Sequence, residues 1–413
     1  MEQLVTTPDI AAQQPQPRRR RRVLLATAAL AAVGALALSA CGGGSDSKDD
    51  KKGGSSTAKG ADITISSKDG ATDASINATG VKVEGGKLTS VKMTSVTSGA
   101  AVEGTISGDG SSWKPKAQLE RGTKYKVTAN AKDDKGNAAT ENATFTTVSS
   151  ANSFIGTYTP DDGTKVGVGM PVSFTFDKAI TEKKDVQSAI TVTSSSGQKV
   201  VGHWFGNQRL DFRPQEYWKA GSKVTMKIAL DGVKGANGAT GVQNKTVTFT
   251  IGRAQVSTVD AKSHQMTVER DGKVIKTIPI SAGSPQNPTY NGKMVISEKF
   301  TQTRMNGSTV GFGGEYDIKD VPHAMRLSTS GTFIHGNYWG APFGSGNTSH
   351  GCVGLRDAQG AGDPSTPGAW FFNNSLIGDV VTVKGSPDKT IAPDNGLNGW
   401  NMSWSQWTAG SAV

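Results

Sequence analysis

The sequence predicts a mainly β protein in which two tandem immunoglobulin-like sandwiches precede a third, β-rich domain. Three observations favour this fold class. Apolar and polar residues alternate in many short segments, and stretches with helical periodicity are scarce. Glycine is frequent, with 52 residues in a chain of 413. One sequence pattern also repeats at an offset of 99 residues, the length of one such sandwich.

The first forty residues are predicted to be a secretory signal peptide rather than part of the fold. Residues 18–22 are five arginines, residues 23–38 are apolar, and a Leu-Ser-Ala tripeptide leads to Cys41. That ending resembles a bacterial lipobox. We therefore expect export, a lipid on Cys41, and anchoring at the outer face of the cytoplasmic membrane, next to the cell wall. An uncleaved membrane anchor is the alternative.

The charge of the chain argues against nucleic acid as a partner. The formal net charge is +10, and the first forty residues hold five arginines and two acids, so the remaining chain carries +7. This charge is spread along the sequence, without a Lys/Arg cluster interleaved with aromatic residues. We expect no nucleic-acid partner.

Residues 41–60 are predicted to form a flexible tether, because they are rich in Gly, Ser, Lys and Asp and almost free of apolar side chains. The two sandwiches are assigned to 61–148 and 149–251. In the repeat, Trp-Lys-Pro of the first sandwich corresponds to Phe-Arg-Pro of the second. Large aromatic side chains are expected in the cores rather than on a binding surface: Trp113, Trp204, Phe212 and Trp218.

Residues 252–385 are predicted to form the third domain, and 386–413 a C-terminal cap rich in tryptophan. A hairpin is expected around Asp271-Gly272, because this pair favours a turn with positive φ. Glycine-rich segments follow at 307–314 and 336–354, where we expect mobile lids or tight supports for a site. A short helix is expected over 369–374.

The third domain concentrates the reactive side chains of the chain. His335, His350 and Cys352 lie within eighteen residues, although the chain has only five histidines and two cysteines. A free thiol in an oxidising compartment is a liability unless it is used. An imidazole can take the thiol proton and return it to a leaving amine. We expect His335 to keep the sulfur anionic, and Gly351 to let nearby backbone N–H groups face an oxyanion.

Other interpretations of these residues stay open. The same three side chains could bind zinc together with His323, although no second cysteine or His-x₃-His pattern supports this. The histidines could be structural, which suits His203 and His264 better. A sortase-like cysteine transpeptidase would need a more distant arginine than Arg356.

A set of motifs resembles the L,D-transpeptidase catalytic domain. His335-Gly336, followed after twelve residues by Ser349-His350-Gly351-Cys352, is similar to the signature of this family. The likeness extends to actinobacterial lipoprotein members that carry two immunoglobulin-like domains ahead of the catalytic one. It continues through four further segments: 328–335, 369–372, 378–381 and 399–407.

The resemblance implies a reaction. A cysteine thiolate would attack the carbonyl before the terminal D-alanine of a peptidoglycan stem tetrapeptide and release that D-alanine. A side-chain amine at the third position of a neighbouring stem would then resolve the acyl-enzyme and form the cross-link. The implied roles are nucleophile for Cys352, base and acid for His335, carbonyl acceptor for Gly336, turn positioning for Ser349, and oxyanion N–H groups at His350, Gly351 and Cys352.

The resemblance also implies a donor pocket formed by Tyr316, Ser330, Gly331 and Trp339, with Met305 matching less closely. One departure is Gly354, where the family usually has Arg or Asn, so a substrate contact is missing or comes from elsewhere; Arg356 is a candidate. Carbapenem β-lactams are implied as inhibitors, and no metal or other cofactor is needed. The alternatives are an L,D-carboxypeptidase, in which water resolves the acyl-enzyme, and a non-catalytic wall-binding lipoprotein.

Overall fold

The computed structural model of the chain describes residues 60–413, and its elements confirm a mainly β fold. The predicted signal peptide, Cys41 and the tether up to residue 59 lie outside the described residues. Within the described part, no helix has the length and apolar character needed to span a membrane. The strands form three groups, and the domain boundaries inferred from the sequence remain predictions.

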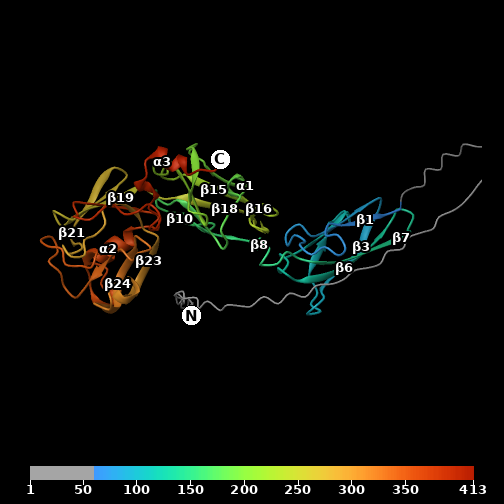
Figure 1. The fold of residues 1–413 in the computed structure, drawn as a ribbon, viewed down its shortest axis with the longest axis horizontal. Coiled ribbons are helices and arrows are strands. Elements are labelled where there is room, and N and C mark those ends of the chain that lie inside the picture. The colour runs from blue at the N-terminus through green and yellow to red at the C-terminus, as the bar shows by residue number, and fades with distance from the viewer. Residues whose placement is uncertain (1–59) are drawn as a thin grey trace, which may run out of the picture. The chain divides into compact units, whose positions relative to one another are not determined.

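The first sandwich contains a four-stranded and a three-stranded sheet (Figure 1). Alternation in its longest strands buries every second side chain, which confirms the pattern seen in the sequence: Tyr125, Val127, Ala129 and Ala131 are all buried. Trp113 lies in the same core. The strands are β1 (Asp62–Ile65), β2 (Val81–Glu84), β5 (Ser112–Pro115) and β4 (Gly104–Ile106), then β3 (Lys87–Ser95), β6 (Lys124–Lys132) and β7 (Ala138–Thr146).

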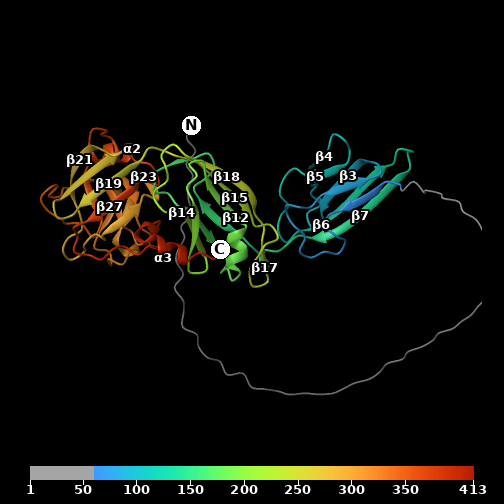
Figure 2. The ribbon, with the colours of Figure 1, turned by 90° about the horizontal axis from the view of Figure 1, so that it is seen from above.

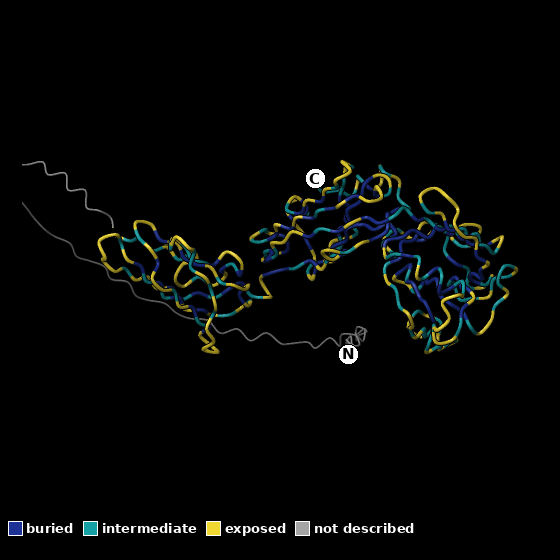
Figure 3. The backbone as a smooth tube through the Cα atoms, turned by 180° about the vertical axis from the view of Figure 1, so that it is seen from behind, coloured by how far each residue is buried: buried dark blue, intermediate teal, exposed yellow. Residues whose placement is uncertain are grey.

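The second sandwich has two four-stranded sheets and a small three-stranded one. Trp204, Phe212 and Trp218 are buried in its core, as predicted. Figure 3 shows buried residues along the strands and exposed residues at their turns. The elements are β10 (Lys165–Val166), β18 (Asn244–Ile251), β15 (Lys223–Ala229) and β12 (Ile190–Ser194); β13 (Val200–Phe205), β14 (Arg209–Pro214), β11 (Val172–Phe176) and β9 (Gly156–Thr159); β16 (Lys234–Ala236), β17 (Ala239–Gly241) and β8 (Ser153–Phe154); and α1 (Lys183–Ser188).

The third domain is organised around one nine-stranded mixed sheet. The predicted hairpin is confirmed, with Asp271 at φ 50° and Gly272 at φ 76° between β20 and β21. Within this sheet, two pairs of strands are parallel, β19 with β27 and β25 with β26, and the other neighbouring strands are antiparallel. The order is β22 (Gly292–Val295), β27 (Val380–Lys384), β19 (Gln255–Asp260), β20 (Gln265–Arg270), β21 (Lys273–Ser281), β26 (Val353–Arg356), β25 (Phe333–Asn337), β24 (Asp317–Arg326) and β23 (Glu298–Asn306).

One helix, α2 (Pro367–Asn374), packs against β24, β25 and β26, and it contains the helix predicted over 369–374. Thr366 caps it by accepting a hydrogen bond from the Ala369 N–H, and proline occupies its first position. Single 3₁₀ turns, η1 (Gly307–Thr309) and η2 (Gln359–Ala361), lie in the connections before and after the central strands. The central parallel pair is thus covered on one face by a well-capped helix.

The C-terminal segment forms the 3₁₀ turn η3 (Gly399–Asn401) and the helix α3 (Trp404–Ala409), which contacts β13 of the second sandwich (Figures 1 and 2). The indole N–H groups of Trp400 and Trp407 donate to the main chain of that sandwich, at 2.7 Å and 2.9 Å. The guanidinium of Arg213 stacks on both rings, 4.6 Å and 4.3 Å from their centroids. The tryptophan cap therefore packs against the second sandwich.

Candidate active site

Strand alternation on β25 presents two polar side chains to one face. His335 and Asn337 are two residues apart and therefore share that face, while Gly336 between them points to the other. The parallel register pairs His335 with Gly354 of β26, so the turn before β26 brings Cys352 close to the histidine. This pairing explains how residues seventeen positions apart in sequence meet in one site.

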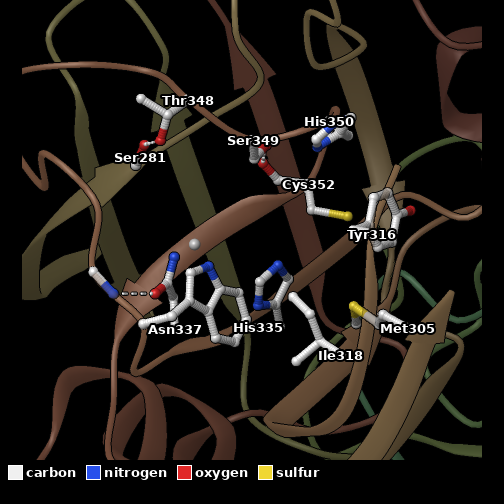
Figure 4. A pocket seen from close by; sticks show the side chains of 13 residues that line it. Ser281, Met305, Tyr316, Ile318, His335, Asn337, Thr348, Ser349, His350 and Cys352 are labelled. Atoms are coloured by element: carbon white, nitrogen blue, oxygen red, sulfur yellow. Dashed lines mark hydrogen bonds between the residues drawn. The ribbon is translucent and has the colours of Figure 1, made fainter. Parts of the chain in front are cut away.

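A cavity of about 280 Å³ opens at this place. Figure 4 shows Cys352 and His335 inside it, with Tyr316 and His350 close to the sulfur. Eight residues predicted for the site line the cavity: Met305, Tyr316, His335, Trp339, Ser349, His350, Cys352 and Gly354. Five further lining residues were missed by the sequence analysis: Ser281, Ile318, Asn337, Gly340 and Thr348.

The imidazole of His335 is buried and fixed in one orientation. Its Nδ1 lies 2.7 Å from the carbonyl oxygen of Gly336. Because a carbonyl can only accept, Nδ1 carries the proton and Nε2 is left as an acceptor. Burial lowers the pKa of His335, while the Gly336 carbonyl and the Asp357 carboxylate act in the opposite direction. The resting imidazole is therefore neutral and able to accept a proton.

The thiol of Cys352 is half-buried and donates to the carbonyl of Gly331 at 3.7 Å. Burial raises the pKa of this thiol to about 11, and a hydrogen bond from the Phe333 backbone offsets only part of the rise. The direction of this shift opposes the expectation that the sulfur is anionic at rest. An apolar surrounding destabilises the thiolate, so the resting group is a neutral thiol beside a neutral imidazole.

The turn that presents the cysteine is held by Ser349. Its hydroxyl donates to the Cys352 carbonyl at 2.5 Å and accepts from the Gly351 N–H at 3.2 Å. Gly351 adopts φ 111°, a conformation that favours glycine. These contacts agree with the positioning role inferred for Ser349. They also occupy the Gly351 N–H, one of the three predicted oxyanion donors, in this state.

The segment between β23 and β24, residues 307–316, covers one side of the cavity and is called the lid here. Glu315 of the lid lies 2.9 Å from the Nε2 atom of His350, and the rings of Phe312 and Tyr316 lie 5.4 Å and 5.0 Å from the His350 ring. Burial, and then the nearby Cys352 and Glu315, raises the pKa of Tyr316 to about 12. The Tyr316 hydroxyl therefore keeps its proton and is available as a donor.

Two predicted pocket residues lie beside the cavity rather than in its lining. Ser330 is exposed and is held by Asn395 of the cap. The Ser330 N–H donates to the Asn395 amide oxygen at 3.0 Å, and the Asn395 amide nitrogen donates to the Ser330 hydroxyl at 2.8 Å. Gly331 supplies the carbonyl near the sulfur and packs closely against Val310 of the lid. Trp339 does line the cavity, with its ring nearly parallel to that of His335 at 5.8 Å.

Packing requires glycine at position 336, whereas any residue could supply the main-chain carbonyl. A Cβ at this position would lie 2.1 Å from the carboxylate of Asp357, which is buried behind β25. That carboxylate is 2.8 Å from the Nδ1 atom of buried His323 and accepts from the Thr366 hydroxyl at 2.7 Å. Within residues 60–413, no three His, Cys, Asp or Glu side chains converge in a way that could hold a metal ion.

The residue after Cys-Val, Gly354, lines the cavity without contributing a side chain. Arg356, a candidate for the missing contact, is exposed and lies with its guanidinium 5.9 Å from the ring of Phe343, outside the cavity lining. Asn337 lines the cavity beside Gly354 instead. The two-residue spacing from His335 on a strand was the sequence signal that could have identified it.

Comparison with known proteins agrees with this geometry. A family model described as L,D-transpeptidase catalytic domain matches residues 254–383, and one described as Bacterial Ig domain matches 71–234. L,D-transpeptidase 2 of Mycobacterium tuberculosis is 33% identical over 356 residues, 85% of this chain and 85% of the relative. The chain belongs to the L,D-transpeptidase family.

Two further relatives of the L,D-transpeptidase family are similar to this chain. L,D-transpeptidase 5 of Mycobacterium tuberculosis is 30% identical over 342 residues, 81% of this chain and 73% of the relative. A solved LD transpeptidase in complex with imipenem is 26% identical and covers 56% of this chain and 99% of its own, with a TM-score of 0.47. The catalytic-domain match contains the whole cavity described here.

Proposed function

We propose that this member of the L,D-transpeptidase family is an exported cysteine acyltransferase that cross-links peptidoglycan stem peptides. The observation that supports it most strongly is the tautomer of His335. Its Nδ1–H is committed to the Gly336 carbonyl, so Nε2 is an acceptor in the cavity that also holds Cys352. Acyl transfer through a cysteine requires at least a thiol and a proton acceptor in the same cavity.

In the proposed first step, the thiol leaves its contact with Gly331 and gives its proton to Nε2 of His335 as the sulfur attacks. The attacked carbonyl precedes the terminal D-alanine of a donor stem tetrapeptide. The tetrahedral intermediate collapses when the C–N bond breaks, and His335 returns the proton to the leaving amine. The products are a thioester on Cys352 and free D-alanine.

In the proposed second step, a side-chain amine from the third residue of a neighbouring stem attacks the thioester. The amine loses a proton to His335, the C–S bond breaks, and the sulfur regains a proton from the imidazolium. The result is an amide cross-link between two third-position residues, with the protein returned to its neutral thiol. Atoms and charges balance without any cofactor.

Product analysis with muropeptides tests this function. The purified protein should release D-alanine from a tetrapeptide donor and form a cross-linked dimer, seen by mass spectrometry. Cys352→Ala should abolish both products, and His335→Ala should slow them by about a hundredfold or more. A tripeptide without dimer would show that water resolves the thioester, the carboxypeptidase outcome. An unchanged rate in Cys352→Ala would refute a cysteine mechanism.

A carbapenem offers a second probe of the same thiol. Attack of the sulfur on its β-lactam carbonyl would break the strained C–N bond of the ring and leave the opened molecule on Cys352 as a thioester. We expect one covalent adduct by intact mass, absent in Cys352→Ala. A non-catalytic wall-binding protein would give no adduct.

Anchoring is proposed separately, on the basis of the lipobox-like residues before Cys41. Cells expressing the full chain and fed with labelled palmitate should incorporate label into the wild type and not into Cys41→Ala. Label in both proteins, or in neither, would contradict a lipid at this residue.

A further inference from the structure

Asn337 places a hydrogen-bond donor in the cavity that no part of the proposed mechanism uses. The residue is 8% exposed, at the end of β25, and on the same face as His335. Its amide oxygen accepts a hydrogen bond from the Gly340 N–H at 3.0 Å, drawn as a dashed line in Figure 4. Because an N–H needs an acceptor, this contact fixes which end of the amide is oxygen.

The opposite end of the same amide, Nδ2, is directed into the cavity. Among residues 60–413 we find no hydrogen bond from Nδ2 to another protein group, although the residue is more than nine-tenths buried. The Nδ2 atom itself is accessible from the cavity, since among the described residues only the Nε atom of Arg213 is a buried side-chain nitrogen or oxygen without a partner. It is therefore free to donate to a ligand oxygen. The arrangement therefore points to an acceptor oxygen on whatever occupies the cavity.

The surroundings of Asn337 indicate why the donor comes from this position. A Cβ built on Gly354 would lie 3.6 Å from Nδ2 and 3.5 Å from the Ser281 carbonyl, which is ordinary van der Waals contact. A Cβ on Gly354 would therefore fit in contact with the Asn337 amide, which occupies the space beside this glycine. The hydroxyls of Ser281 and Thr348, 3.3 Å apart, line the same side, whereas Met305 and Ile318 lie on another side of the cavity (Figure 4).

We propose that Asn337 binds an oxygen at the scissile end of the donor peptide and supplies the polar contact that Gly354 does not. This inference rests on the proposed function. Residues two apart on a strand are about 7 Å apart, so a group bound by Asn337 is close in the peptide to the carbonyl that reacts beside His335. The candidate oxygens are the carboxylate of the terminal D-alanine and a main-chain carbonyl next to it.

Two variants separate the donor from the rest of the residue. Asn337→Asp keeps an oxygen for the Gly340 N–H but replaces the Nδ2 donor with an acceptor. Asn337→Ala removes both ends, and serves as the second variant if the first does not fold. Asn373→Ala, at an exposed position in α2 and outside the cavity, is the matched control.

The assay measures kcat/KM for D-alanine release from a tetrapeptide donor and for D-alaninamide release from the same peptide with a C-terminal carboxamide. We expect Asn337→Ala to lose about tenfold on the carboxylate donor, and Asn337→Asp to lose more, because two negative charges then face each other. If the carboxylate is the ligand, Asn337→Asp loses much less on the carboxamide donor. If a main-chain carbonyl is the ligand, both donors lose equally.

A relocation experiment tests the link to Gly354. The double variant Asn337→Ala, Gly354→Asn places a new amide beside the space that the Asn337 side chain leaves, and it should recover at least about threefold of the lost kcat/KM. If kcat/KM falls by less than about twofold in both Asn337→Asp and Asn337→Ala, on both donor peptides, the inference is overturned. Failure of the wild type to release D-alanine would instead refute the proposed function, so the two failures are distinguishable.

Discussion

Burial gives Cys352 and His335 the same preference for their neutral forms, although one is an acid and the other a base. The pKa of the thiol rises to about 11 and the pKa of the imidazole falls, because each charged form would be poorly solvated. In the proposed reaction, the thiolate therefore forms only as the substrate is attacked. The neutral form also protects the sulfur, because thiols are oxidised mainly as thiolates.

Alkylation of Cys352 by iodoacetamide should report this protonation state. Since the reagent reacts with the thiolate, we expect the rate to keep rising up to about pH 11, whereas a free cysteine peptide levels off above its pKa of about 8.5. Intact mass at timed quenches provides the measurement. A plateau already reached near pH 7 would reveal a resting thiolate–imidazolium pair and contradict the structure.

Asp357 is buried behind the strand that carries His335. Its carboxylate lies against the Gly336 backbone, whose carbonyl orients His335, and its negative charge raises the pKa of that imidazole. His323, which holds this carboxylate, adopts φ 47°, a left-handed conformation that is costly for a residue other than glycine.

The variant Asp357→Asn should shift the acid limb of kcat/KM to lower pH. His335 must be neutral to accept the thiol proton, so activity rises as pH increases through its pKa, which burial keeps below the usual value. Removing a negative charge that favours the imidazolium lowers this pKa further. Asp363→Asn, an exposed carboxylate in the same connection, should leave the limb in place. An unchanged or raised limb in Asp357→Asn would contradict the role.

The sequence predicted Cys352 and His335 as nucleophile and base because reactive residues are rare in this chain and stand in a specific motif, and the structure places both in one cavity. It did not identify Asp357, since a carboxylate after a strand is common and only the α2 packing brings it behind Gly336. Asn337 could have been inferred from strand alternation with His335. The protonation state of Cys352 could not, because it depends on burial that the motif does not specify.

Among the elements, the turn between β24 and β25 depends on the cap for its position. Asn395 binds Ser330, and fully buried Asn398 donates to the Leu327 carbonyl at 3.0 Å and to the Asn395 carbonyl at 2.6 Å. Asn398 also accepts from the Val295 N–H at 2.9 Å. Since Gly331 of this turn holds the resting thiol, the cap contributes to the geometry of the site.

Substituting Asn398 by alanine should weaken both the fold and the site. Two buried main-chain groups and one part-buried carbonyl would lose their partner, at a cost of about 2–3 kcal/mol of unfolding free energy. Urea denaturation measures this loss, and D-alanine release should fall as the turn loosens. Ser405→Ala, exposed in α3, is the control and should stay within about 0.5 kcal/mol of the wild type. Equal stability of the two variants would show that the cap is not coupled to the turn.

Local sequence signals predicted elements better than their arrangement. Alternation predicted β6, the Asp-Gly pair predicted the turn between β20 and β21, and the short helix lies where α2 is found. The order of the nine-stranded sheet was not predicted. Its neighbours β19 and β27 are more than a hundred residues apart, and pairing at such separation depends on the packed core rather than on local pattern.

At the scale of the whole molecule, the cap joins the core of the second sandwich to the catalytic domain. Trp400 of the cap and Val295 of the catalytic sheet belong to the same buried cluster as the sandwich core. Trp407 is fully buried and stacks on His203 at 4.8 Å. Arg213, whose pKa burial lowers to about 10, lies among three cap tryptophans. The sequence predicted the cap but gave no signal for where it would pack.

Removal of one cap side chain should therefore destabilise more than the cap. Trp407→Ala should cost about 3–5 kcal/mol of unfolding free energy, because it leaves a large cavity against the second sandwich. Trp404→Ala, at a half-buried position in the same helix, should cost about 1 kcal/mol. Both are measured by denaturant unfolding. A loss in Trp407→Ala no larger than that of Trp404→Ala would contradict a shared core.

The most direct test of the central claim is the mass of the protein quenched during reaction with a stem tetrapeptide in the absence of an acceptor amine. The account predicts a gain equal to the tetrapeptide minus D-alanine, mapped by proteolysis to Cys352, lost in Cys352→Ala and slow to form in His335→Ala. An adduct on another residue, or D-alanine released at the wild-type rate by Cys352→Ala, would contradict it.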